Sequence, residues 1–78
     1  MATVRGYIYD TLGNPVENAT IVFPDVPSFA LSHEDGFYQI DDVNLGAQRV
    51  FIVQRYYSKK ITSISINGDT HADFILEV

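Results

Sequence analysis

The chain contains no cysteine, three prolines and five basic residues among its 78 residues. The absence of cysteine excludes disulfide bonds and thiolate metal sites, so neither can stabilise the fold. A chain of this length has room for a single thin core, and we expect residues 1–78 to form one domain. Apolar runs are short as well, because none approaches the roughly 20 residues that cross a bilayer.

Motifs for catalysis and for cofactor binding are also missing. His33 and His71 lack a zinc-ligand spacing such as H-E-x-x-H, and no glycine-rich phosphate loop occurs. Ser32 has no nucleophile-elbow context, and the pair Asp41-Asp42 lacks the alternating acids of a calcium loop. We therefore expect a protein that is not an enzyme and that uses no cofactor and no metal.

Positive charge is scarce and unevenly placed in a chain whose net charge is −5. One stretch without any acid holds four of the five basic residues, namely Arg49, Arg55, Lys59 and Lys60. The negative balance argues against nucleic acid as a partner. The basic stretch suits an acidic surface on another protein.

The sequence is rich in short segments in which apolar and polar residues alternate. Asp, Gly, Asn and Pro separate these segments, a pattern typical of a small antiparallel β-sandwich. The segments lie at residues 4–9, 19–23, 29–32, 37–40, 48–54, 61–66 and 70–77. No segment has the period of a helix. We expect an all-β fold, a seven-stranded antiparallel β-sandwich without a helix.

Local signals refine this expectation. The pairs Asp35-Gly36 and Asn67-Gly68 are strong turn signals, and each predicts a hairpin between the strands on either side. Ile61 and Ile64 are out of phase for a strand with one buried face, which predicts a bulge or a bend between them.

The alternation also predicts which bulky side chains face outward. If Val4 and Ile8 lie in the core, Tyr7 and Tyr9 lie on the opposite face of their strand. Exposed apolar surface of this extent marks a contact site, although plain pairing of neighbouring aromatics on the sheet is the alternative interpretation. The candidate partner-binding residues are Tyr7, Tyr9, Phe37, Phe51, Val53, Tyr56, Tyr57, Arg49, Arg55, Lys59, Lys60, Val26 and Phe29.

Taken in order, the motifs resemble the carboxypeptidase regulatory-like domains, whose fold is a transthyretin-like (prealbumin-like) sandwich. The matching patterns are Val4-x-Gly6-x-Ile8-x-Asp10-x-x-Gly13-x-Pro15, Ala19-x-Ile21, Ser32-x-x-Asp35-Gly36-x-Tyr38-x-Ile40 and Val43-x-x-Gly46. The chain departs from the family at Arg55-Tyr56, where the family commonly carries Gly-Tyr. The first strand also lacks the lysine that forms an isopeptide bond in related adhesin sandwiches. The resemblance implies a non-catalytic structural or interaction module.

We therefore expect a module that docks on a larger or symmetric protein assembly, and we consider self-association as well. The narrower prediction is a viral capsid decoration or tail accessory protein at the virion surface. The alternative is a carbohydrate- or ligand-binding domain of a secreted or cell-surface protein, with Tyr7, Tyr9, Tyr56 and Tyr57 stacking on sugar rings. Residues 1–5 do not resemble the start of a secretion signal, and we expect neither such a signal nor insertion into a membrane.

Overall fold

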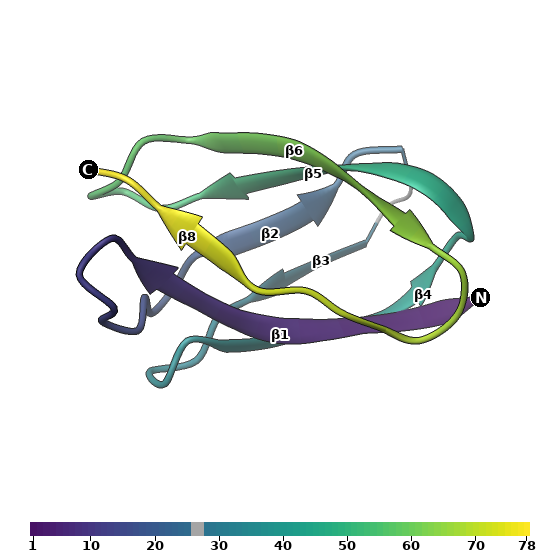
Figure 1. The fold of residues 1–78 in the computed structure, drawn as a ribbon, viewed down its shortest axis with the longest axis horizontal. Helices are drawn as coiled ribbons and strands as arrows, with labels where there is room; N and C mark the ends of the chain where they lie inside the picture. Colours follow the sequence, from purple (N-terminus) through teal and green to yellow (C-terminus); the bar gives the residue numbers. More distant parts are fainter. Residues whose placement is uncertain (26–27) are drawn as a thin grey trace.

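The computed structural model describes residues 1–25 and 28–78, which form eight strands and no helix. The strands pack as two sheets face to face (Figure 1). The β1 sheet consists of β1 (Ala2–Asp10), β4 (Phe37–Val43), β7 (Thr70–His71) and β8 (Phe74–Leu76). The β5 sheet consists of β2 (Thr20–Phe23), β3 (Ser28–Leu31), β5 (Gly46–Val53) and β6 (Lys60–Ile66). The predicted all-β sandwich is confirmed, and no described segment forms an apolar helix that could span a membrane.

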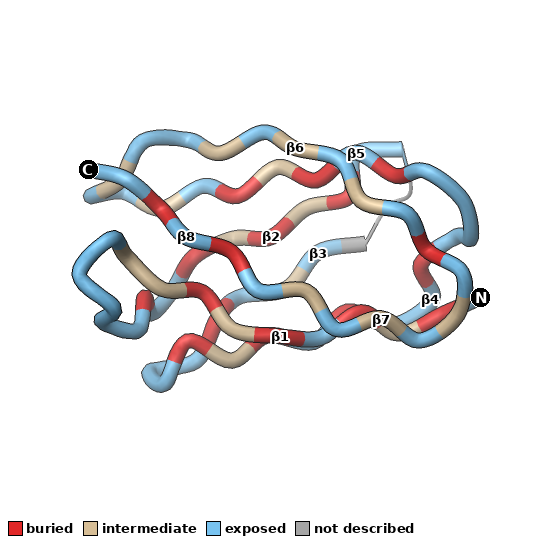
Figure 2. The backbone as a smooth tube through the Cα atoms, viewed as in Figure 1, coloured by how far each residue is buried: buried red, intermediate tan, exposed pale blue. Residues whose placement is uncertain are grey.

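The core lies between the two sheets and follows the alternation of the sequence. Buried positions alternate with more exposed ones along β1, β4 and β5 (Figure 2), as expected when one face of each strand is covered by the other sheet. The largest fully buried side chains are Tyr38, Phe23, Ile8, Ile21, Ile52, Ile66, Leu76, Val4, Val43 and Val50. Because side chains on a strand alternate between its faces, these residues leave their neighbours to form the outer faces of the sandwich.

Ser32 is a buried polar residue whose role is structural. Its hydroxyl donates a hydrogen bond of 2.7 Å to the Val16 carbonyl and accepts one of 2.9 Å from the Ala19 N–H. The side chain thus pairs two backbone groups of the segment that leads into β2. A buried hydroxyl needs partners of this kind, and Ser32 has them within the fold.

The prediction of a wholly antiparallel sandwich is wrong for the last strand. β7 and β8 both run parallel to β1, and they replace the single predicted strand at residues 70–77. The predicted hairpin at Asn67-Gly68 is also wrong, since β6 pairs with β5 whereas β7 pairs with β1. The turn at residues 67–69 therefore carries the chain from one sheet to the other.

The turn at Asp35-Gly36 is present, but it too connects the sheets. The Gly36 N–H donates to the His33 carbonyl at 2.9 Å, and Gly36 has a φ of 86°. One further bond, from the His33 N–H to the Phe37 carbonyl at 2.8 Å, closes the turn. Beyond it the strands diverge, because β3 pairs with β2 and β4 pairs with β1.

The predicted bulge between Ile61 and Ile64 is absent. β6 pairs with β5 in one continuous register, from Lys60 opposite Ile52 to Ile66 opposite Gly46. The two isoleucines differ in phase because they lie on opposite faces: Ile64 packs against the core and Ile61 faces outward, 62% exposed. An outward isoleucine, and not an irregular backbone, explains the pattern.

Candidate interaction surface

The outer face of the β5 sheet carries a continuous row of apolar side chains that crosses all four strands. Val22 of β2 lies opposite Phe29 of β3 on one side and Phe51 of β5 on the other. Phe51 in turn lies opposite Ile61 of β6. Because directly opposite residues point to the same side of a sheet, the four side chains form one row.

A second row lies beside the first. Thr20 of β2 pairs with Leu31 of β3 and with Val53 of β5, so Leu31 and Val53 face outward next to the first row. The most exposed side chains of the two rows are Phe29 (69%), Ile61 (62%), Leu31 (52%) and Val53 (45%). We refer to Val22, Phe29, Leu31, Phe51, Val53 and Ile61 together as the outer patch.

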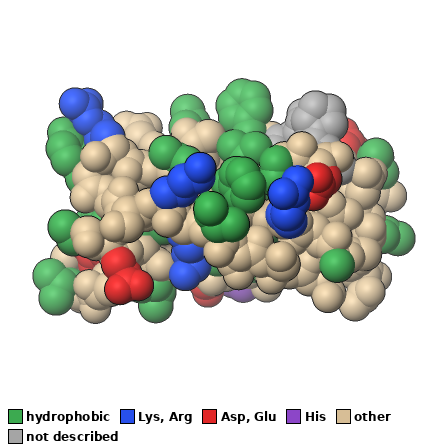
Figure 3. Space-filling view, turned by 90° about the horizontal axis from the view of Figure 1, so that it is seen from above, with side chains coloured by type: hydrophobic (Ala, Val, Ile, Leu, Met, Phe, Trp, Pro, Cys, Tyr) green, Lys and Arg blue, Asp and Glu red, His purple; other side chains and the backbone are tan. Residues whose placement is uncertain are grey.

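Two cations flank the centre of the outer patch. The Arg49 guanidinium carbon lies 5.9 Å from the centroid of the Phe51 ring, and the Lys59 ammonium nitrogen lies 5.2 Å from it. Both distances fall within the range of cation–π attraction. Figure 3 shows this face, with hydrophobic side chains in the middle and Lys and Arg side chains on either side of them. The patch is therefore apolar at its centre and positive at its margin.

The two cations differ in their pairing. Arg49 forms a bidentate ion pair with Asp25, with distances of 3.0 and 2.7 Å. Hydrogen bonding to Arg49 lowers the pKa of the Asp25 carboxyl, and the same pair raises the pKa of the Arg49 guanidinium. Lys59 forms no ion pair with any residue that the structure describes. The uncompensated positive charge at the patch margin thus comes from Lys59.

The structure gathers five of the predicted contact residues on this face and adds three that the sequence reasoning missed. Phe29, Arg49, Phe51, Val53 and Lys59 were predicted. Val22, Leu31 and Ile61 were not, because their position depends on which strands are neighbours. Two signals in the sequence pointed to them: Val22 lies between the core residues Ile21 and Phe23, and Ile61 is out of phase with Ile64, a feature that instead predicted a bulge. The predicted contact residue Val26 lies outside the described residues.

Three predicted aromatics lie on the outer face of the other sheet. Tyr7 stacks on Tyr9 with ring centroids 6.0 Å apart, and it meets Phe37 edge to face at 5.5 Å. The Phe37 ring lies 6.2 Å from that of His33. Tyr7, Tyr9 and Phe37 are half-buried, whereas His33 is exposed. Tyr7 and Phe37 are directly opposite on β1 and β4, and their contact is a cross-strand aromatic pair, whereas Tyr9 lies two residues along β1 on the same face.

The remaining predicted residues follow β5 or begin β6. Arg55 lies over the ring of Tyr56, with the guanidinium carbon 5.0 Å from the ring centroid, and Tyr56 is 68% exposed. Tyr57 packs against the core, and its hydroxyl donates to Asp10 at 3.2 Å. Lys60 is half-buried at the start of β6.

The four tyrosines proposed to stack on sugars do not share one platform. Tyr7 and Tyr9 belong to β1, whereas Tyr56 and Tyr57 belong to the loop after β5 in the opposite sheet. Tyr57 is engaged with the core and with Asp10. The arrangement therefore gives the carbohydrate-binding alternative no continuous aromatic surface.

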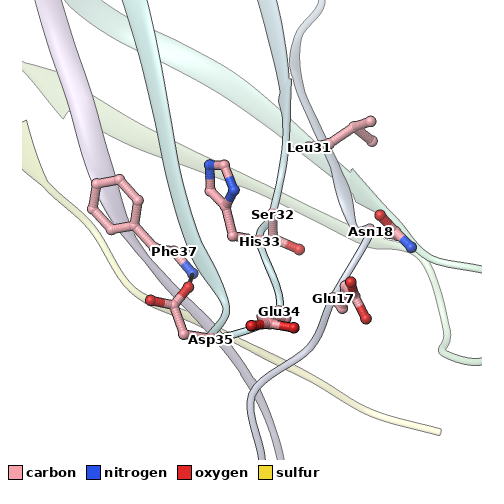
Figure 4. A pocket seen from close by; sticks show the side chains of 8 residues that line it. All are labelled: Glu17, Asn18, Leu31, Ser32, His33, Glu34, Asp35 and Phe37. Carbon is pink, nitrogen blue, oxygen red and sulfur yellow. Dashed lines mark hydrogen bonds between the residues drawn. The ribbon is translucent and has the colours of Figure 1, made fainter.

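A shallow hollow lies at one end of the sandwich, beside β3 and the turn at residues 33–36 (Figure 4). The carboxylates of Glu17, Glu34 and Asp35 line one part of it, with His33 and Leu31 at the other. No group of three or more His, Cys, Asp or Glu side chains within residues 1–25 and 28–78 is arranged to hold a metal ion. The hollow is an acidic surface depression next to the outer patch.

Comparison with known proteins identifies the fold but no family. No family model matches the chain, and no curated protein matches it. The chain is similar to a chain in the crystal structure of a type II Cohesin-X-Dockerin complex from Acetivibrio cellulolyticus, a C-terminal interface mutant, with a TM-score of 0.85 and 19% identity. The match covers 97% of this chain and 57% of that one.

Two further structures give the same result. The N-terminal interface mutant of the same complex matches with a TM-score of 0.82 and 20% identity over 97% of this chain and 57% of that chain. A DUF3823 family protein from Bacteroides ovatus matches with a TM-score of 0.75 and 18% identity over 97% of this chain and 44% of that chain. This chain thus spans about half the length of the chains it matches. The similarity supports the β-sandwich fold, and the carboxypeptidase regulatory-like resemblance stays a prediction.

Proposed function

We propose that the chain is a non-catalytic interaction module that docks on a larger protein assembly through the outer patch. The observation that carries this proposal is the pair of adjacent apolar rows across the β5 sheet, with four side chains between 45% and 69% exposed. Exposed apolar patches of this kind on small domains mark contact surfaces. An apolar centre with aromatic residues and a polar margin is the usual anatomy of such a surface.

The charge of the patch indicates the chemistry of its partner. The chain carries a net charge of −5. Lys59 nevertheless flanks Phe51 and has no acidic partner in the described structure. A complementary surface would have an apolar centre and carboxylates at its edge. The similar chains from Cohesin-X-Dockerin structures come from protein–protein complexes, which supports an interaction role for the fold.

The experiment compares two positions of matched exposure on opposite sheets. Leu31 of the outer patch is 52% exposed, and Ile75 of β8 is 53% exposed. A photoreactive residue at position 31, expressed in the source organism, should cross-link to one dominant protein, and the same residue at position 75 should not. With that protein purified, Leu31→Ser should weaken binding about tenfold, or about 1.4 kcal/mol. Ile75→Ser should leave affinity within about twofold, the usual range for a residue outside the contact.

Equal cross-linking from both positions would contradict a docking role for the outer patch. The narrower proposal, a capsid decoration or tail accessory protein, has a separate test, because the similar structures give it no specific support. Density-gradient sedimentation of native material should place the chain with a megadalton particle at fixed stoichiometry. A chain that stays at the top of the gradient would overturn that narrower proposal and leave docking on a smaller partner open to the cross-linking test.

A further inference from the structure

The edges of a β-sheet offer unpaired backbone N–H and C=O groups, and natural proteins protect them with charge, bulges or short strands. The edge formed by β4 is protected in this way. Its pairing with β1 shifts register between Ala2 and Val4, and Asp41 and Asp42 lie at this irregularity. Asp42 has a φ of 61°, so the strand bends there.

Two other edges are short. The free side of the β1 sheet opposite β4 is formed by β7 and β8, of two and three residues, with a break between them. The outer strand of the β5 sheet on the other side, β3, has four residues. Strands of this length present few unpaired groups to another chain.

Apart from Lys60 at its start, the edge formed by β6 lacks these protections. β6 has seven residues, Lys60-Ile61-Thr62-Ser63-Ile64-Ser65-Ile66, with no proline and no charge after Lys60. It pairs with β5 without a bulge, and no further strand pairs with it in the described structure. Its isoleucines and threonine favour strand pairing. Ile64 faces the core but stays half-buried, because no other described strand covers the open side of β6.

We propose that β6 pairs with β6 of a second copy, antiparallel about a two-fold axis at Ser63. In this register all seven residues find partners, and outward side chains meet outward side chains: Ser63 faces Ser63, and Ile61 faces Ser65. Each β5 sheet continues into the other as one sheet of twice the width. A two-fold interface of this kind is self-complementary and closes after two copies.

Charge favours the second copy as the occupant of this edge. Lys59 and Lys60 stand at the start of β6, and Asp69 lies just after its end, held by a 3.0 Å hydrogen bond from the Thr3 N–H. Antiparallel pairing brings the basic end of each copy beside the acidic end of the other. Parallel pairing would bring like charges together and is disfavoured for that reason.

This pairing is independent of the docking role and adds to it. The two outer patches would lie on the same side of the continuous sheet, because the pleat keeps outward residues outward across the new junction. A dimer would then present both patches to one extended or symmetric partner surface. Two linked contacts bind more tightly than one when the geometry allows both to engage.

The test uses the absence of cysteine in the natural chain, which makes any introduced thiol unique. Sedimentation velocity should show a species of twice the monomer mass that grows with concentration. Ser63→Cys should form a disulfide dimer in a glutathione redox buffer, because opposite Cα atoms about 4.5–5.5 Å apart suit a disulfide. Ser65→Cys is the matched control, exposed on the same face of the same strand.

In the Ser65→Cys variant the two thiols of a dimer would lie about 13 Å apart along the paired strands, too far to bridge. We expect the disulfide of Ser63→Cys to form about tenfold faster than that of Ser65→Cys, since only the thiols at position 63 are held at a high effective concentration. A monomer at all concentrations, or equal rates for the two variants, would overturn the proposal. Loss of the dimer in Phe29→Ser/Leu31→Ser, which leaves β6 intact, would also overturn it and assign the association to the outer patch.

Discussion

At the scale of single residues, two glycines allow the cost of a left-handed backbone to be distinguished from the cost of a steric clash. Gly13 and Gly36 both have a φ of 86°, a region that side chains rarely adopt. A Cβ at position 13 meets nothing within 4 Å, whereas a Cβ at position 36 lies 2.5 Å from the Ile8 carbonyl oxygen. The Ile8 N–H also donates to the Gly36 carbonyl at 2.8 Å, so neither backbone can withdraw without loss of a hydrogen bond.

We therefore expect Gly13→Ala to lower the free energy of unfolding by about 1–2 kcal/mol, the cost of the left-handed conformation alone. Gly36→Ala should lower it by about 3 kcal/mol or more, because the close contact adds to that cost. Chemical denaturation of the two variants side by side measures the difference. Equal losses would show that the turn at Gly36 relaxes away from β1.

At the scale of strands, a third glycine explains why the last strand is broken in two. The segment between β7 and β8 runs close to β1 at Gly6, where an added Cβ would lie 1.9 Å from the Ala72 carbonyl oxygen. The Ala72 N–H donates to the Arg5 carbonyl at 2.8 Å, and the Asp73 side chain accepts from the Tyr7 N–H at 2.8 Å. Between β7 and β8, the Asp73 carboxylate thus accepts the bond from β1 that a backbone carbonyl would accept in a continuous strand.

Gly6→Ala should therefore displace the segment between β7 and β8. The obstructing atoms belong to the backbone of Ala72, so no side-chain rotation can relieve the contact. We expect a loss of about 4 kcal/mol or more, within the small class of severely destabilising substitutions. Hydrogen exchange should show lost protection at β7 and β8 before β2 and β5. Gly13→Ala is the control for replacing a glycine. Unchanged hydrogen exchange at β7 and β8 in Gly6→Ala would contradict this account.

The strands themselves could be predicted from the sequence, but their neighbours could not. Alternation placed Val4 and Ile8 in the core because burial of one face imposes a period of two within each strand. Which sheet a strand joins depends on contacts between distant residues, and a turn signal such as Asn67-Gly68 states only that the chain reverses. The predicted hairpin after β6 was wrong for this reason.

At the scale of the whole molecule, the same limit applies to the candidate surface. Phe29, Phe51 and Val53 were predicted as candidate contact residues, and the structure places them on the outer face of the β5 sheet. That they form one patch with Leu31 and Ile61 follows from the order β3-β2-β5-β6 and from its register. A surface assembled from four strands has no contiguous signature in the sequence.

The stability of the whole fold at alkaline pH should depend on Tyr38. Its ring is fully buried in the core near Phe74, and its hydroxyl donates to the Ala72 carbonyl. Burial, and secondarily the negative charge of Asp73, raises the pKa of this phenol well above its usual value. An unfolded tyrosine ionises at about pH 10, so between that pH and the higher folded value the folded state holds a proton that the unfolded state has lost. The stabilisation is thus complete below about pH 10 and is lost as pH rises above it.

Tyr38→Phe should lower the free energy of unfolding by about 0.5–1.5 kcal/mol at neutral pH, through loss of the hydrogen bond to Ala72. The variant cannot ionise at this position, so the difference between it and the natural protein should shrink as pH rises above about 10. Urea denaturation at a series of pH values from neutral to strongly alkaline measures this difference directly. Tyr56→Phe is the control, because Tyr56 is 68% exposed and contributes nothing to the core. A difference for Tyr38→Phe that stays constant across the series would mean that the hydroxyl reaches solvent in the native state, and that the two sheets close less tightly around it than the structure indicates.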